Sequence, residues 1–174
     1  VGSGLQICWV TEEALFDSPS DDNIADAEDR LGNIFIAVAN TPGTLIIEES
    51  TARGRTGVFY KRFKEAESWE SVKANDQFST DCQRVSLFFP WFVFPVEDIP
   101  AMTPDEDVEF LNSLRGEEDT YRKKVLREVG VALTGHQMAW RRWAVSNLCD
   151  NKLDRFDRDF PWSAETAFTS SGNP

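Results

Sequence analysis

Thr11, Glu12 and Glu13 are the first residues along the chain that could take part in chemistry, because they directly follow the apolar run Leu5–Val10. A carboxylate at the carboxyl end of a buried strand can orient a metal ion or an attacking water molecule. Phosphoryl-transfer sites need that role, since the protein mainly positions the nucleophile and offsets charge. The structural alternative is a helix N-terminus, where acidic side chains stabilise the helix dipole.

A second polar cluster, Glu49–Gly54, follows the apolar run Thr44–Glu48 and contains a carboxylate, two hydroxyls and a guanidinium. Taken alone, it is also typical of a loop capped by Ser and Thr that ends in a glycine turn. Parallel strands bring their carboxyl ends to the same edge of a sheet. We therefore expect the two polar clusters to lie close together, and each strengthens a functional interpretation of the other.

Basic residues are concentrated between positions 53 and 64 of a chain whose net charge is −12. They predict either contact with phosphate or a solvated helix face. Arg141 and Arg142 lie between Trp140 and Trp143, where an arginine can stack or grip a nucleic-acid backbone, although tryptophans at helical spacing usually belong to a core. The basic cluster consists of Arg53, Arg55, Lys61, Arg62 and Lys64.

The motifs of several kinds of catalytic site are missing from the sequence. His136 is the only histidine and the three cysteines lack CxxC spacing, so neither a zinc site nor a disulfide framework is indicated, and a reducing cytosol fits best. The sequence has no G-x-S-x-G nucleophile elbow. It also has no G-x-x-x-x-G-K-[ST] loop, so the chain carries no Walker A motif of its own.

Length and composition indicate a folded protein, since 41% of the 174 residues are hydrophobic. The longest apolar stretch is interrupted by Pro90 and Pro95, so no membrane span is predicted. The acidic balance disfavours broad coating of nucleic acid, although a local basic stripe or a ring of subunits could still hold it. The chain starts without Met or a signal peptide, and we interpret it as an internal piece of a longer protein.

The elements that must position the polar clusters follow from apolar spacing. Strands at Leu5–Val10 and Thr44–Glu48, joined by a helix with an apolar stripe from Ile24 to Val38, predict a βαβ unit of a parallel sheet. Val58–Trp69 is predicted to be a helix, and Val85–Phe89 to be a third strand. The intervening polar residues 71–84 are predicted to form a loop.

The second half of the sequence is predicted to be mainly helical. Thr103–Glu106 and Thr134–Gln137 have the form of capping boxes, which start helices. Tyr121–Val129 has the pattern of a charged amphipathic helix. We expect a boundary near Glu97–Pro104, which divides an α/β part, residues 1–98, from a mainly helical part, residues 99–174.

Five segments, read in order, resemble the large terminase subunits, which are the DNA-packaging motors of tailed phages. The first is similar to their Walker B segment and the second to the E-S-T-A-x-G-x-x-G-x-F-Y motif. Trp9, Glu13 and Thr166 depart from the family pattern, and Glu13 leaves two adjacent acids to choose between, although the spacing to Ala14 favours Glu12. The segments are Leu5–Ala14, Ile47–Tyr60, Leu87–Trp91, Leu133–Arg142 and Phe160–Phe168.

The resemblance implies a fold and a set of roles. The chain would be part of a P-loop, RecA-like ATPase core with a three-layer parallel sheet, followed by a helical linker toward a nuclease domain. Glu12 would be the catalytic carboxylate that orients water toward the γ-phosphate of ATP, and Thr11 would contribute to the Mg²⁺ shell through water. Ser50 and Thr51 would belong to the coupling motif, and Arg53 would contact phosphate or a neighbouring subunit.

The resemblance also implies partners: double-stranded DNA, a portal protein, a small terminase subunit and further copies in a homo-oligomeric ring. The location would be the cytoplasm of an infected bacterium, at the procapsid portal, with no membrane. Walker A and the nuclease acids would lie outside residues 1–174, so this chain alone would be inactive. Two alternatives stay open: a helicase-like nucleic-acid-dependent ATPase, and a non-catalytic interaction domain that docks through the acidic stretch Glu97–Asp119.

Overall fold

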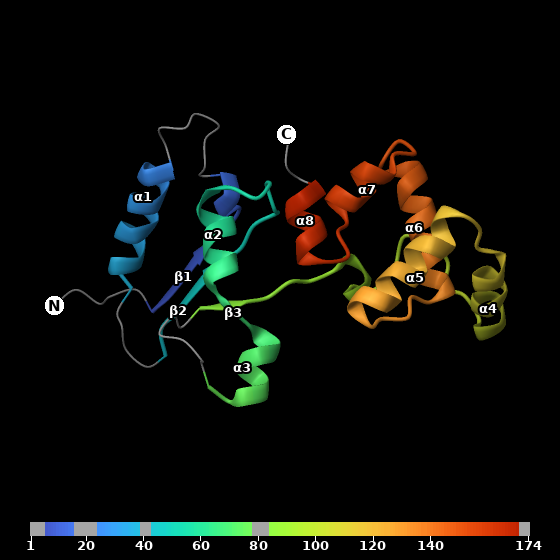
Figure 1. The fold of residues 1–174 in the computed structure, drawn as a ribbon, viewed down its shortest axis with the longest axis horizontal. Coiled ribbons are helices and arrows are strands. Elements are labelled where there is room, and N and C mark those ends of the chain that lie inside the picture. The colour runs from blue at the N-terminus through green and yellow to red at the C-terminus, as the bar shows by residue number, and fades with distance from the viewer. Residues whose placement is uncertain (1–5, 16–23, 39–42, 78–83, 171–174) are drawn as a thin grey trace. The chain divides into compact units, whose positions relative to one another are not determined.

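The computed structural model describes residues 6–15, 24–38, 43–77 and 84–170 (Figure 1). The chain is mixed α/β and mostly helical, with two small parallel two-stranded sheets among these residues. The described residues as far as Leu87 form one compact unit, and Phe88–Ser170 form a second. This division, between Leu87 and Phe88, comes before the expected boundary range Glu97–Pro104.

The first unit contains the predicted βαβ arrangement. Strand β1 (Ile7–Val10) and strand β2 (Leu45–Glu48) are joined through helix α1 (Ile24–Ile36) and pair in parallel, with Val10 opposite Glu48. Val10, Leu31 and Val58 form the small buried core of this unit. The prediction of two adjacent parallel strands is therefore confirmed, while Leu5 lies outside the described residues.

The middle of the chain differs from prediction in two ways. Helix α2 (Gly57–Glu65) ends early, and helix α3 (Trp69–Asn75) occupies part of the expected loop, because the Ser68 hydroxyl caps it by accepting from the Ser71 N–H at 3.2 Å. The expected third strand is only Val85–Ser86 (β4), which pairs with β3 (Glu67–Ser68) in a separate sheet. The expected strand residues Leu87–Phe89 lie in neither a strand nor a helix.

The second unit consists of five helices and a short 3₁₀ helix, Trp91–Val93, among the described residues. Both predicted capping boxes are confirmed: Thr103 exchanges hydrogen bonds with Glu106, and Thr134 with Gln137. Each box satisfies backbone donors that a helix start would otherwise leave unpaired. The helices are α4 (Pro104–Ser113), α5 (Glu117–Val129), α6 (Gly135–Asn147), α7 (Leu153–Asp159) and α8 (Ala164–Ser170).

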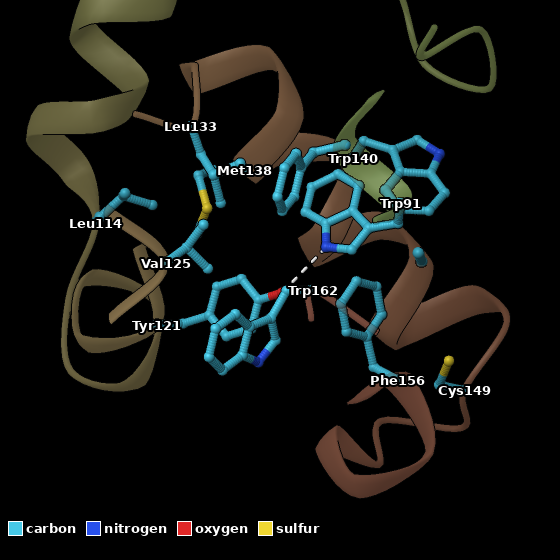
Figure 2. Packing of buried hydrophobic residues seen from close by; sticks show 12 residues of the cluster. Trp91, Leu114, Tyr121, Val125, Leu133, Met138, Trp140, Cys149, Phe156 and Trp162 are labelled. Atoms are coloured by element: carbon cyan, nitrogen blue, oxygen red, sulfur yellow. Dashed lines mark hydrogen bonds between the residues drawn. The ribbon is translucent and has the colours of Figure 1, made fainter. Parts of the chain in front are cut away.

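An aromatic cluster forms the core of the second unit (Figure 2). Trp91 stacks on Trp140 with ring centroids 5.0 Å apart, and Phe156 meets Trp91 edge-on at 5.9 Å. Offset stacking and edge-to-face contacts are the arrangements that aromatic quadrupoles favour. Trp140 therefore belongs to the core, as its helical spacing suggested.

Helices α4 and α6 pack tightly against each other at Gly135. A Cβ atom at this position would lie 2.2 Å from the backbone carbonyl oxygen of Asp107. The Asp107 carboxylate meanwhile accepts a hydrogen bond from the His136 N–H at 2.8 Å, which holds the two helices together. Only glycine fits this contact without a backbone shift.

Gly135→Ala is expected to lower the free energy of unfolding by roughly 1–3 kcal/mol, the usual penalty of overpacking. Gly32→Ala is the matched control, because a Cβ at Gly32 of helix α1 meets nothing within 4 Å. Chemical denaturation of the chain, compared between the two variants, measures the difference. Equal stabilities would show that α4 shifts freely to admit the methyl group.

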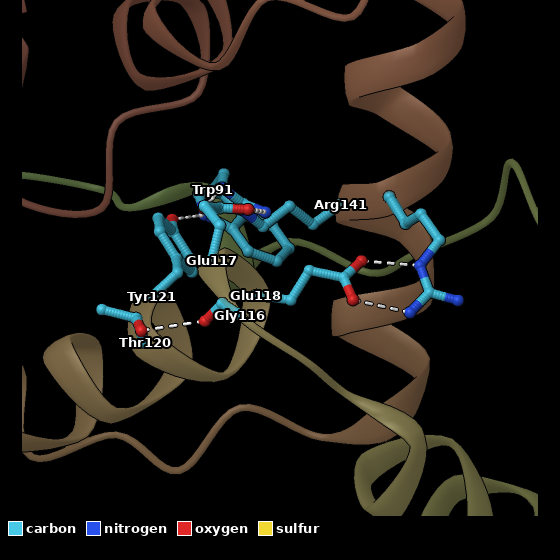
Figure 3. A network of polar contacts seen from close by, with 8 residues as sticks. Trp91, Gly116, Glu117, Glu118, Thr120, Tyr121 and Arg141 are labelled. Atoms are coloured by element: carbon cyan, nitrogen blue, oxygen red, sulfur yellow. Dashed lines mark hydrogen bonds and ion pairs between the residues drawn. The ribbon is translucent and has the colours of Figure 1, made fainter.

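A polar network around Tyr121 crosses this core (Figure 3). The Tyr121 hydroxyl accepts from Trp91 Nε1 at 3.0 Å, and the buried Arg141 guanidinium lies 3.9 Å from the Tyr121 ring centroid. Arg141 donates to both carboxylate oxygens of Glu117, and Arg142 pairs with Glu118. The suggestion that these arginines grip a nucleic acid is therefore not supported, since both guanidiniums are engaged within the protein.

Burial raises the pKa of the Tyr121 phenol from 10.0 to about 12. In the unfolded chain the phenol ionises near its ordinary pKa, so its contribution to stability is complete below that value and is lost as pH rises toward 12. Denaturation measured from neutral to strongly alkaline pH should show this loss, and Tyr121→Phe should reduce it. The same alkaline slope in both proteins would contradict the prediction.

Candidate functional site

The two polar clusters of the sequence meet where β1 and β2 end. Backbone pairing continues past both strands, because the Glu49 N–H donates to the Val10 carbonyl at 2.9 Å and the Glu13 N–H donates to the Glu49 carbonyl at 3.1 Å. These bonds hold the segment after β1 beside the segment after β2. The expectation that both clusters lie at one edge of a shared sheet is confirmed.

Hydroxyl groups of the second cluster reach across to the first. Thr51 Oγ1 donates to Glu12 Oε1 at 3.5 Å, the long end of hydrogen bonding, and both residues are exposed. Ser50 Oγ accepts from the Ala14 N–H at 3.0 Å and donates to the Thr51 carbonyl at 3.0 Å. Ser50 thus links the two strand ends, while Glu12 and Thr51 face solvent.

Glu12 has an unusual backbone conformation, with φ of 53°, in the left-handed region. Residues other than glycine seldom adopt this conformation, because it strains the backbone. Such strained residues concentrate at functional sites. The 3₁₀ helix Glu13–Leu15 begins immediately afterwards. The sharp change of direction separates the side chains of the two adjacent acids.

Glu13 lies inside the protein, with none of its side chain exposed. Arg62 of helix α2 donates from Nη1 to Glu13 Oε1 at 3.4 Å and forms an ion pair with Glu48 Oε1 as well. The Arg62 guanidinium also lies 4.9 Å from the centroid of the Phe35 ring. The two adjacent acids therefore differ in exposure: Glu12 is the exposed carboxylate, and Glu13 is the buried one.

The sequence did not predict this role of Arg62. It placed Arg62 in a basic cluster that was expected either to contact phosphate or to form a solvated helix face. One signal pointed to it: Arg62 comes four residues after the buried Val58, on the same face of the helix. Lys61 and Arg53 of the basic cluster behave differently. Lys61 forms an exposed ion pair with Glu28 at 2.7 Å. Arg53 is exposed, and its side chain has no hydrogen bond to another described residue.

The donor set at the strand ends suits a hard cation. Within the described residues, no group of three or more His, Cys, Asp or Glu side chains could hold a metal ion. Mg²⁺ does not need such a cage, because it keeps several waters and commonly takes one or two carboxylates together with substrate phosphates. The Glu12 carboxylate and the exposed Thr11 hydroxyl fit this water-rich mode of binding.

A different hollow, of about 300 Å³, lies in the second unit and is mainly apolar. Its walls include Trp91, Phe94, Trp140 and Phe160, with Asp98 and Asp159 at hand. The Asp98 carboxylate accepts from Trp140 Nε1 at 2.8 Å, and Asp159 pairs with Arg155 and Arg158. The acids of this hollow are thus engaged in the structure of the unit, and the strand ends remain the candidate site.

Two further observations bear on the chain as a whole. Among the described residues, no helix combines the length and the apolar character needed to cross a bilayer. Comparisons with models of protein families, with curated proteins and with solved structures find no match to this chain. An assignment of function therefore depends on the geometry at the ends of β1 and β2 and on the order of the motifs.

Proposed function

We propose that this chain is the part of a viral DNA-packaging ATPase that carries the Walker B segment and the coupling motif. One observation carries the proposal: Glu12 and Thr51 come within 3.5 Å at the carboxyl ends of two adjacent parallel strands. In open α/β sheets this edge is where ligands bind. The ordered resemblance of the five motifs to large terminase subunits supports the same assignment.

Each polar residue then has a chemical role. Glu12 accepts a hydrogen bond from the attacking water and orients it toward the γ-phosphate, and Thr11 contacts the Mg²⁺ shell. Mg²⁺, when bound with ATP, offsets the charge of the phosphate oxygens. Ser50 bridges Ala14 and Thr51, so a displacement at the end of one strand is passed to the other. Arg53 is exposed at the same edge and contacts phosphate or a neighbouring subunit.

Exposed apolar residues on β1 and β2 support a larger sheet. Ile7 and Trp9 are each 63% exposed and Leu45 is 52% exposed, although parallel sheets normally have both faces covered. A two-stranded sheet is also marginal alone. We propose that further strands and helices of the full-length polypeptide cover these residues and complete a three-layer, RecA-like core, which includes the Walker A loop.

The test is ATP hydrolysis by the full-length polypeptide with and without blunt double-stranded DNA. The proposal predicts Mg²⁺-dependent hydrolysis that the duplex stimulates, without release of single strands. Release of single strands would instead support the helicase-like alternative. Absence of hydrolysis by the folded full-length protein, with its portal and small-subunit partners present, would overturn the proposal in favour of an interaction domain.

A further inference from the structure

We infer that Arg62 is a positioning residue for Glu12, and that it acts by holding the neighbouring Glu13 inside the protein. This inference rests on the proposed function, because it assigns Glu12 the reacting role. The juxtaposition that carries it is a single guanidinium, on helix α2, in contact with carboxylates from both strand ends.

The network formed by Glu13, Glu48 and Arg62 is largely buried. Glu13 is 0% exposed, and the side chains of Arg62 and Glu48 are 13% and 15% exposed. Glu13 Oε1 and Glu48 Oε1 both contact Arg62 Nη1, so the two carboxylates lie close together around one cation. Without that cation the two carboxylates would repel each other in a poorly solvated place, which is strongly unfavourable.

Glu12 and Glu13 are consecutive residues, so the position of one constrains the other. Arg62 fixes the Glu13 side chain, and the Glu49 carbonyl fixes the Glu13 N–H at 3.1 Å. With both ends of Glu13 held, the left-handed backbone at Glu12 directs its side chain to the opposite, exposed side, where Thr51 meets it. Release of Glu13 toward water would remove the contact that opposes relaxation of this strained backbone.

Arginine suits position 62 better than lysine does. Its planar guanidinium packs here over the ring of Phe35, 4.9 Å from the ring centroid, while Nη1 contacts both carboxylates. A lysine would supply one compact charge without the stacking surface. Arg62→Lys should therefore lower kcat less than Arg62→Met does.

The experiment measures hydrogen exchange and ATP turnover in the full-length protein. Arg62→Met is expected to speed exchange of the Glu13 and Ala14 amides about tenfold, since local opening becomes easier. It is expected to lower kcat roughly 10- to 100-fold, the usual effect of misplacing a reacting group by about an ångström, with KM for ATP changed about twofold at most. Lys61→Met is the matched control, because it removes an ion pair from the same helix without touching Glu13.

The double variant Arg62→Met/Glu13→Gln keeps the test decisive if Arg62→Met fails to fold. It removes the cation and neutralises one buried carboxylate, so folding should recover while kcat stays low. Turnover equal to that of Lys61→Met in a folded double variant, or unchanged amide exchange in Arg62→Met, would overturn the inference. If Glu12→Gln itself retains turnover, the reacting role given to Glu12 in the proposed function fails, and amide exchange still shows whether Arg62 holds the Glu12–Glu13 segment.

Discussion

Replacing Glu12 by glutamine is expected to reduce ATP turnover by the full-length protein roughly 10²- to 10⁴-fold, the contribution that a positioned general base makes. Glutamine keeps the length of the side chain and can still contact Thr51. It loses the negative charge that, in the proposed function, polarises the attacking water. Binding of ATP should change little, because the proposed function has Glu12 act on the water and not on the phosphates of the ground state.

Steady-state hydrolysis and equilibrium binding of a fluorescent ATP analogue separate these two effects. Glu65→Gln is the control, since Glu65 is exposed at the end of helix α2 and lies outside the two polar clusters. Turnover in Glu12→Gln close to that of the control would remove Glu12 from the proposed role. Parallel loss of ATP binding would assign Glu12 to holding the nucleotide and not to activating water.

Truncating Phe156 to alanine is expected to lower the free energy of unfolding by roughly 3–5 kcal/mol, the usual range for a large core aromatic. Phe156 is 0% exposed and contacts the rings of Trp91, Tyr121 and Trp140. Its removal leaves a cavity among rigid rings that cannot readily collapse. The same change also takes one aromatic face away from the buried Arg141 guanidinium, 5.1 Å from the ring centroid.

Denaturation followed by tryptophan fluorescence measures this loss, because Trp91 and Trp140 report on the same cluster. Leu153→Ala on the same helix is the control, since Leu153 is 39% exposed and lies outside that core. We expect it to change the free energy of unfolding far less. Similar losses in both variants would mean that helix α7, and not the aromatic cluster, determines the stability of this unit.

Features governed by local chemistry could be predicted from the sequence. The capping boxes at Thr103 and Thr134 depend only on residues three apart, so they are readable without the fold. The pairing of β1 with β2 follows from two apolar runs joined by one amphipathic helix. The meeting of Glu12 with Thr51 then follows from the topology of parallel strands.

Features that depend on distant neighbours could not be predicted. Arg62 and Arg141 look like surface cations in the sequence, and both are largely buried because Glu13 and Glu117 meet them from other elements. The pairing of β4 with β3 could not be predicted either, because a two-residue strand is too short to show an apolar pattern. Burial of a charge is a tertiary property, and its compensation comes from residues remote in the sequence.

The left-handed backbone at Glu12 lowers the stability of the fold at the residue on which the proposed activity depends. A non-glycine residue in this conformation costs roughly 1–2 kcal/mol, and among the described residues Glu12 gains one long hydrogen bond, from Thr51. Glu12→Gly should therefore be tolerated by the fold more readily than most changes nearby. Laboratory evolution for heat resistance alone would tend to discard this glutamate, and evolution for turnover would restore it.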